Sequence, residues 1–94
     1  MLKIEKNHNG HYRLSGRFDA AQAEEAEQIL GDLDNSVTLD FSDLDYISSS
    51  GLTILIQTHK RLDKSGHQLK LVNLNDHIRD VFMYTRLDQV FDIE

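Results

Sequence analysis

The chain has 94 residues, no cysteine and a formal net charge of −6 at pH 7. This length is typical of one domain with one hydrophobic core and leaves little room for an enclosed substrate cavity, while the missing thiols exclude disulfides, zinc–thiolate sites and cysteine nucleophiles. Acidic residues outnumber basic ones by 16 to 10, and no Lys/Arg cluster could follow a phosphate backbone, so we expect no direct nucleic-acid binding.

The first part of the chain predicts a β-hairpin. Apolar and polar residues alternate over residues 2–5 and again over residues 11–15, as in strands with one buried face. Residues 7–10 between them are a turn signal, with Asn9-Gly10 at the tip of the turn.

A helix is expected next, over residues 20–30. Asp19, followed three residues later by Gln22, resembles a capping box at its start, and Gly31 would help to close it. The side chains expected to face the core are Ala23, Ala26, Ile29 and Leu30.

The middle of the chain predicts a strand, a loop and the longest helix. Residues 37–41 are β-rich and mostly apolar, as in a central strand. The helix is expected over residues 50–64, with Ser65-Gly66 as its stop. Its apolar residues recur at helical spacing: Leu52, Leu55, Ile56, His59 and Leu62.

The remaining residues predict a strand over 69–72, a helix capped by Asn75 and a short last strand over 90–93. The third helix carries Ile78, Val81, Phe82 and Tyr84, and we expect both Met83 and Tyr84 in the core. Because helices separate most of the strands, neighbouring strands should be parallel and joined by right-handed crossovers. We therefore predict an α/β fold with a mixed sheet of four to five strands and helices packed mainly on one face.

Three consecutive serines, Ser48, Ser49 and Ser50, lie at the predicted start of the longest helix. Unpaired backbone N–H groups and the positive end of the helix dipole gather at such a place, which can therefore hold a phosphate, either as a ligand or attached to a serine. The structural alternative is that one serine is simply an N-cap and that Gly51 permits close packing.

Asp40 near the end of the predicted central strand, Ser49-Ser50-Gly51-Leu52 at the start of the longest helix and Gly16-Arg17-Phe18-Asp19 before the first helix form a set of three motifs. Together they resemble the signature of the STAS domain, the fold of bacterial anti-sigma factor antagonists. Asp40 matches the acidic or amide residue that ends a strand, residues 49–52 (Ser-Ser-Gly-Leu) match the element that opens a helix, and residues 16–19 (Gly-Arg-Phe-Asp) match the motif before the first helix. The resemblance covers the whole chain, so we expect residues 1–94 to form one STAS domain. The chain departs from the pattern at Ser48, where many members carry Asp.

This resemblance implies a binding protein that is controlled by phosphorylation, not an enzyme, and it implies no cofactor. In such proteins a partner kinase, often the anti-sigma factor itself, phosphorylates the serine at the position of Ser49. The unmodified protein binds this partner and thereby releases the sigma factor, the phosphorylated form lets go, and a phosphatase resets the switch. Because Ser48 departs from the pattern, Ser48 and Ser50 remain alternative acceptors.

The residues expected to form the partner-binding switch are Asp19, Asp40, Ser48, Ser49, Ser50, Gly51, Leu52 and Ile54. Asp40 either orients the Ser49 hydroxyl or engages the kinase, or else it orders a loop through backbone hydrogen bonds. Asp19 has the same functional interpretation, with helix capping as its alternative. Ile54 falls outside the predicted apolar stripe, so it is either a partner contact or a single exposed apolar residue.

Other functions find less support in the sequence. The five histidines form no His-x-x-x-His pair, so no metal site is expected, and the Gly-x-Ser-x-Gly and phosphate-loop motifs of enzymes are absent. No run is apolar enough for a secretory signal or for membrane insertion, so a cytoplasmic protein is expected. The alternative is a non-switching STAS subunit of a membrane lipid-transport complex, but such subunits tend to lack the Ser-Ser-Gly element.

Overall fold

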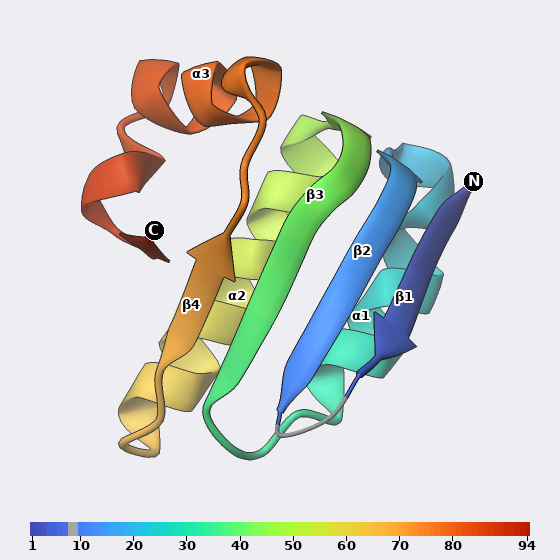
Figure 1. Cartoon of the computed structure of the whole chain (residues 1–94). Coiled ribbons are helices and arrows are strands. Elements are labelled where there is room, and N and C mark those ends of the chain that lie inside the picture. The colour runs from blue at the N-terminus through green and yellow to red at the C-terminus, as the bar shows by residue number, and fades with distance from the viewer. Residues whose placement is uncertain (8–9) are drawn as a thin grey trace.

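The computed structural model describes residues 1–7 and 10–94. Five strands form one mixed sheet in the order β1-β2-β3-β4-β5 (Figure 1). The elements in chain order are β1 (Leu2–Lys6), β2 (His11–Phe18), η1 (Ala20–Gln22), α1 (Ala23–Gly31), β3 (Val37–Ile47), α2 (Ser49–Lys64), β4 (Leu69–Val72), α3 (Asp76–Tyr84), η2 (Leu87–Gln89) and β5 (Asp92–Ile93). The predicted α/β fold with a mixed sheet is confirmed.

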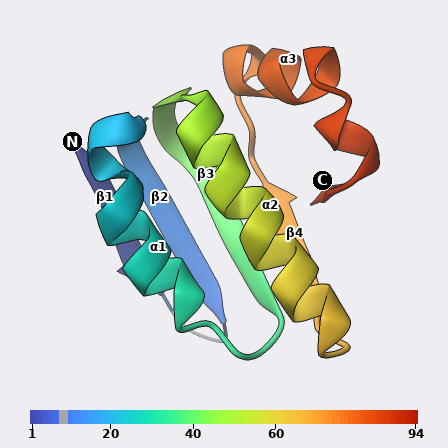
Figure 2. The same ribbon diagram turned by 180° about the vertical axis from the view of Figure 1, so that it is seen from behind.

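The sheet combines one antiparallel hairpin with three parallel pairings. Strands β1 and β2 pair antiparallel, whereas β2, β3, β4 and β5 pair parallel to one another. Helices α1 and α2 lie side by side over one face of the sheet, and α3 lies beyond the end of β4 (Figures 1 and 2). The predicted tip of the hairpin turn includes Asn9, which lies outside the described residues.

Strands β2 and β3 are both longer than predicted. They stay paired up to Phe18 and Ile47, and two register shifts along the pair absorb the unequal spacing of the two chains. Residues 42–47, which were expected in a loop, therefore belong to β3. Gly16 permits this arrangement, because its φ is +89° and a Cβ there would lie against the carbonyl oxygen of Met1.

The start of the first helix also differs from the prediction. A short 3₁₀ turn, η1, precedes α1, and the Asp19 side chain makes no capping hydrogen bond, so the predicted capping box is wrong. The reason is that the Gln22 side chain has another partner: its Oε1 accepts a hydrogen bond from the Leu2 backbone N–H at 3.2 Å.

The core lies between the sheet and the two helices α1 and α2, and it extends to α3. Ile54 belongs to this core with 5% of its surface exposed, so the prediction that it falls outside the apolar stripe is wrong. Helix α2 packs against α1 as well as the sheet and therefore buries a wider stripe than the spacing alone suggests. Arg61 supports this packing by donating to the carbonyl oxygens of Leu30 and Leu33 at 2.8 and 2.6 Å.

The C-terminal part of the chain packs through aromatic rings. Phe82 of α3 makes edge-on contacts with Phe41 and Phe91, at centroid distances of 6.3 and 5.6 Å. Met83 and Tyr84 point away from this cluster, with 55% and 86% of their surfaces exposed, so the prediction that they lie in the core is wrong. One side of this nine-residue helix, which carries Ile78 and Phe82, is enough to cover the core.

Candidate functional site

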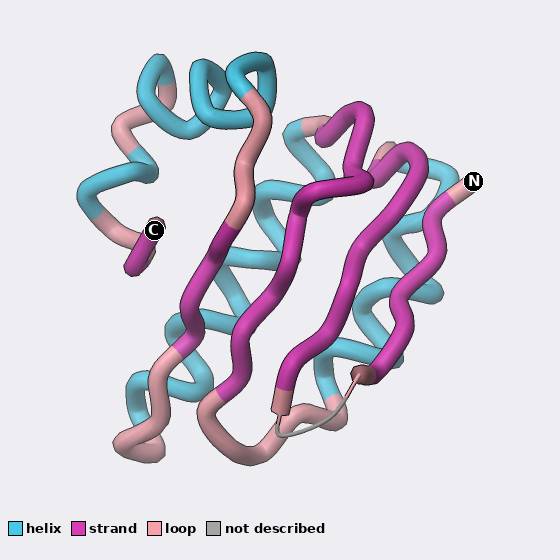
Figure 3. Tube along the Cα trace, viewed as in Figure 1, coloured by secondary structure: helices cyan, strands magenta, loops and turns pink. Residues whose placement is uncertain are grey.

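The serine triplet and Asp19 meet where β2 and β3 end together. The Ser48 backbone N–H donates to the Phe18 carbonyl oxygen at 2.9 Å, so the residues that leave the two strands lie next to each other. At this point β3 turns over and leads into α2 (Figure 3). The structure therefore brings Asp19 and residues 48–50 to one end of the sheet, as the sequence motifs imply.

Ser48 is the N-cap of α2. Its backbone is extended and its side-chain oxygen accepts a hydrogen bond from the Gly51 backbone N–H at 3.2 Å. This bond satisfies one of the unpaired donors of the first turn, and an N-cap serine of this kind stabilises a helix by about 1 kcal/mol relative to alanine. The Ser48 hydroxyl is thus engaged within the fold, as the structural interpretation of the triplet expects.

Ser49 is the first residue of α2, and its side chain is exposed. Within the described part of the chain its hydroxyl makes no hydrogen bond to another protein group, whereas its carbonyl oxygen accepts from the Thr53 hydroxyl at 2.9 Å. Ser50 is half-buried. Of the three serines, Ser49 therefore presents the most accessible hydroxyl, at the positive end of a helix of 16 residues.

Gly51 and Leu52 hold the start of α2 against the sheet. A Cβ at Gly51 would lie 2.9 Å from Ile47 Cγ1 and 3.0 Å from the Phe18 carbonyl oxygen, so only glycine fits this close contact. Leu52 is 8% exposed and belongs to the core. With Ile54 also buried, the Leu52 and Ile54 side chains position the site and leave little surface for direct contact with a partner.

Asp19 presents a carboxylate beside the serines. Its Oδ2 lies 3.7 Å from Arg17 Nε, and its Oδ1 is buried without a hydrogen-bond partner among the residues that the structure describes. The Arg17 guanidinium in turn lies 4.3 Å from the ring centroid of Tyr46. No local pattern predicts that Arg17 and Tyr46 lie together, because Tyr46 was expected in a loop. The register of β2 and β3, which pairs them, brings them into contact.

Asp40 lies in the middle of β3 and has different neighbours. Its Oδ1 accepts hydrogen bonds from the Ser42 backbone N–H at 2.9 Å and from the Asn73 amide at 3.2 Å. In the described residues it makes no hydrogen bond to Ser49. Asn73 lies in the connection between β4 and α3 and has a positive φ of 60°. Because the Asn73 amide donates to Asp40, the Asp40 carboxylate helps to order this connection. This arrangement matches the structural alternative for Asp40, which is the ordering of backbone by hydrogen bonds.

The environment of Asp40 predicts a pH dependence of stability. Burial alone would raise the pKa of the carboxyl, but the hydrogen bonds from Ser42 and Asn73, helped by Arg13, outweigh burial and lower the pKa. The ionised form therefore stabilises the fold above the unfolded pKa of about 3.9, and this contribution is lost as the pH falls through the lower folded value. We expect Asp40→Asn to unfold at a lower temperature than wild type at pH 7 and to lose less on acidification to pH 3.

Thermal unfolding at the two pH values tests this, with Asp45→Asn in the same strand as the control for the loss of one exposed carboxylate. If the melting temperature fell by the same amount between pH 7 and pH 3 in Asp40→Asn and in wild type, the ionised Asp40 carboxylate would not stabilise the fold.

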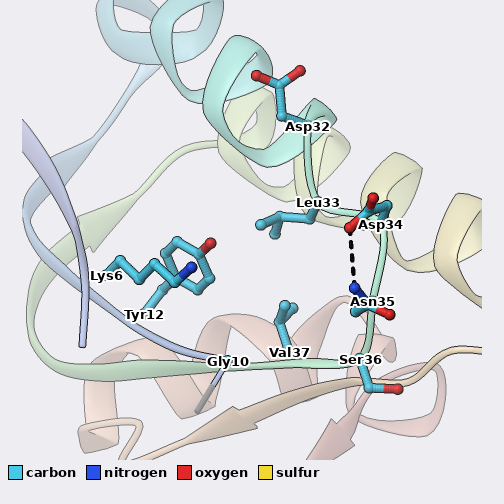
Figure 4. Close-up of a pocket in the computed structure, with 9 residues that line it drawn as sticks. All are labelled: Lys6, Gly10, Tyr12, Asp32, Leu33, Asp34, Asn35, Ser36 and Val37. Carbon is cyan, nitrogen blue, oxygen red and sulfur yellow. Dashed lines mark hydrogen bonds between the residues drawn. The ribbon is translucent and has the colours of Figure 1, made fainter. Parts of the chain in front are cut away.

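The hollows of the surface offer no evident small-molecule site. One hollow of about 500 Å³ lies at the opposite end of the sheet from the serines, beside Gly10. Figure 4 shows Tyr12, Leu33 and Val37 directed toward its interior, whereas Asp32 points away. This hollow lies apart from Asp19 and the serines, so it forms no part of the candidate site. In residues 1–7 and 10–94 no three His, Asp or Glu side chains gather as metal ligands, and no helix has the length and apolar character to span a membrane.

Comparison with known proteins gives one family and several relatives. The STAS domain family model matches residues 2–94. BtrV of Bordetella bronchiseptica, provisionally named as an anti-sigma factor antagonist, is 33% identical over 84 residues, which cover 85% of this chain and 72% of that protein. The anti-sigma-B factor antagonist of Bacillus subtilis is 37% identical over 51 residues, which cover 54% of this chain and about half (47%) of that protein.

Among solved structures, the phosphorylated form of SpoIIAA, a cell fate determinant of Bacillus, superposes with a TM-score of 0.71 at 17% identity and covers 100% of this chain and 91% of that chain. The unphosphorylated form of SpoIIAA, which is described as an anti-sigma factor antagonist, superposes with a TM-score of 0.68 at 17% identity. The match covers 96% of this chain and 97% of that chain. The likeness extends over nearly the whole of both chains and shows the same fold.

Proposed function

The chain belongs to the STAS domain family, as its motifs suggested, and from this premise we propose that it is an anti-sigma factor antagonist whose binding is switched by phosphorylation of Ser49. The observation that carries the proposal is the exposed Ser49 hydroxyl at the first position of α2. The names of the relatives BtrV and the anti-sigma-B factor antagonist support the same kind of partner. The protein would bind an anti-sigma factor and would not be an enzyme.

Ser49 is favoured over its neighbours as the acceptor because a kinase must reach the hydroxyl. The Ser48 oxygen accepts the bond that caps α2, and Ser50 is half-buried. Phosphorylation of Ser49 would leave this capping bond in place. The kinase would be the anti-sigma factor itself or a protein acting with it, a phosphatase would reverse the modification, and the cycle would take place in the cytoplasm.

The fold should accept a phosphate on Ser49. Phosphorylation adds about −1.5 to −2 charges, and a negative charge in the first turn is stabilised by roughly 0.3–1 kcal/mol through the helix dipole. SpoIIAA, which has the same fold, has been solved in a phosphorylated form. The modification should therefore change the surface that the partner meets and leave the domain folded.

Direct phosphorylation tests the proposal. The purified protein is incubated with ATP and an anti-sigma factor of the serine-kinase type from the same organism, and the products are separated on a phosphate-affinity gel. We expect one shifted band, which Ser49→Ala abolishes and both Ser48→Ala and Ser50→Ala retain. A band that persists in Ser49→Ala would contradict the assignment, and stable co-purification with a transporter ATPase without any phosphorylation would favour the lipid-transport alternative.

A further inference from the structure

A groove runs between the two helices that cover the sheet. Helices α1 and α2 lie side by side on the same face (Figure 2), and the hollow between them has a volume of about 220 Å³. The residues that line it are Glu27, Gly31, Ile54, Gln57, Thr58 and Arg61. Pockets for small-molecule ligands usually measure about 300–1,000 Å³, so this groove suits a single inserted side chain better than a metabolite.

Gly31 lines the groove and contributes no side chain to it. Its φ is not in the positive region, and a Cβ built there would meet no atom within 4 Å. Neither the backbone conformation nor the packing of α1 therefore requires glycine at this position. The fold would accept a larger residue, and the space above Gly31 is left free for another molecule.

The floor of the groove is apolar and its polar groups are already paired. Ile54 is 5% exposed, and the buried Thr58 hydroxyl donates to the Ile54 carbonyl oxygen at 2.8 Å. Arg61 directs its guanidinium to the two carbonyl oxygens at the end of α1. In contrast, the exposed Glu27 carboxylate on the rim makes no ion pair within residues 1–7 and 10–94. An apolar side chain thus fits the floor, and a cation fits the rim.

The charge of the surrounding chain points to a basic partner. No Lys or Arg occurs between Arg17 and Lys60, a stretch that includes α1, β3 and the first part of α2. Helix α1, which forms one wall of the groove, carries Glu24, Glu25 and Glu27. The Arg61 side chain, which lines the groove from α2, is directed to the Leu30 and Leu33 carbonyl oxygens. Such a one-sided distribution attracts a positively charged surface and speeds its association.

The groove is close enough to Ser49 for one partner to cover both. Gln57 on the groove rim and Ser49 are both exposed on α2, and the eight residue steps from one to the other correspond to about 12 Å along the helix axis. An interface of ordinary size buries roughly 800 Å² on each protein, which spans such a distance.

We propose that the groove between α1 and α2 is an anchor site for the anti-sigma factor, and that it receives an apolar side chain flanked by Lys or Arg. This inference rests on the proposed function and adds a second contact to it. The partner would touch α2 at two places: at Ser49, where phosphorylation acts, and at the groove, which phosphorylation leaves unchanged.

Filling the groove tests the proposal. We expect Gly31→Leu to raise the dissociation constant for the anti-sigma factor by about tenfold or more, equivalent to 1.4 kcal/mol, while the melting temperature stays the same or rises. Glu27→Lys on the rim should also weaken binding, and more than Glu25→Lys, which makes the same change of net charge on α1 without lining the groove. Isothermal titration calorimetry at two salt concentrations gives both the affinities and their dependence on charge.

The outcomes separate this proposal from the switch. If Ser49→Asp lost binding while Gly31→Leu and Glu27→Lys bound like wild type, the anchor site in the groove would be contradicted. The phosphorylation switch at Ser49 would still be supported. If wild type bound no anti-sigma factor of its own organism, both proposals would fall. An NMR titration of the wild-type protein provides a reading without any mutation: the amides of Gly31, Gln57 and Thr58 should shift on addition of the partner, and unchanged signals there would overturn the anchor site.

Discussion

Ser49→Asp is expected to weaken binding of the anti-sigma factor by about 100-fold relative to Ser49→Ala, a difference of roughly 3 kcal/mol. Ser49 is exposed at the first position of α2, so a docked partner would have to enclose the new carboxylate. An unpaired charge that becomes buried in an interface costs about 3–5 kcal/mol. Ser49→Ala removes only a hydroxyl that has no hydrogen-bond partner in residues 1–7 and 10–94, and it should bind at least as well as wild type.

The same substitution should leave the domain folded. A carboxylate in the first turn interacts favourably with the helix dipole, so the melting temperature of Ser49→Asp should equal or slightly exceed that of wild type. Ser65→Asp at the other end of α2 is the matched control: it adds the same charge at an exposed position, should lower stability slightly and should leave partner affinity unchanged. Equal affinities of Ser49→Asp and Ser49→Ala for the anti-sigma factor, measured by calorimetry, would contradict the proposal that a charge at Ser49 switches binding.

Local patterns predict much of this fold, and the segment at the end of β3 that they miss has a clear physical cause. Residues 2–5 alternate and residues 69–72 are a short apolar run between turn signals, and both form strands close to the expected bounds. Residues 42–47 include Ser42, Asp43 and Asp45, which look like a loop in the sequence, yet they lie in β3 because β2 continues beside them. Strand pairing decides this segment, and pairing depends on residues that are far apart in the sequence.

The same limit applies to the candidate site. The start of α2 was predictable because the serines precede apolar residues that recur at helical spacing. The structure places Ser49 at the first position of this helix. The relation between Asp19 and Ser48 depends on the pairing of Phe18 with Ile47 after two register shifts, and shifts of this kind leave no local signal. Asp40 matches its family motif in sequence, but its hydrogen bonds lead to the connection before α3 and not to the serines.

Gly51→Ala is expected to destabilise the domain by about 1–3 kcal/mol, the usual effect of inserting a methyl group into a tightly packed contact. The new Cβ would lie 2.9 Å from Ile47 Cγ1, 3.0 Å from the Phe18 carbonyl oxygen and 3.1 Å from Phe18 Cδ1. One of these atoms is backbone and cannot rotate away. The gain of up to about 1 kcal/mol from replacing glycine in a helix offsets only part of the cost. For a domain of this size each kcal/mol lowers the melting temperature by about 4–8 °C.

Gly31→Ala makes the same chemical change at the end of α1, where a Cβ meets no atom within 4 Å, so this control should keep or raise the melting temperature. The effect of Gly51→Ala should also reach the switch. The Phe18 carbonyl oxygen that the methyl group would strike is the acceptor for the Ser48 backbone N–H, so relief of the clash must move the start of α2 away from β2. Phosphorylation of Ser49 should then be slower in Gly51→Ala than in wild type at a temperature where both are folded. Equal phosphorylation rates and an unchanged melting temperature would show that the contact at Gly51 does not set the position of the serine.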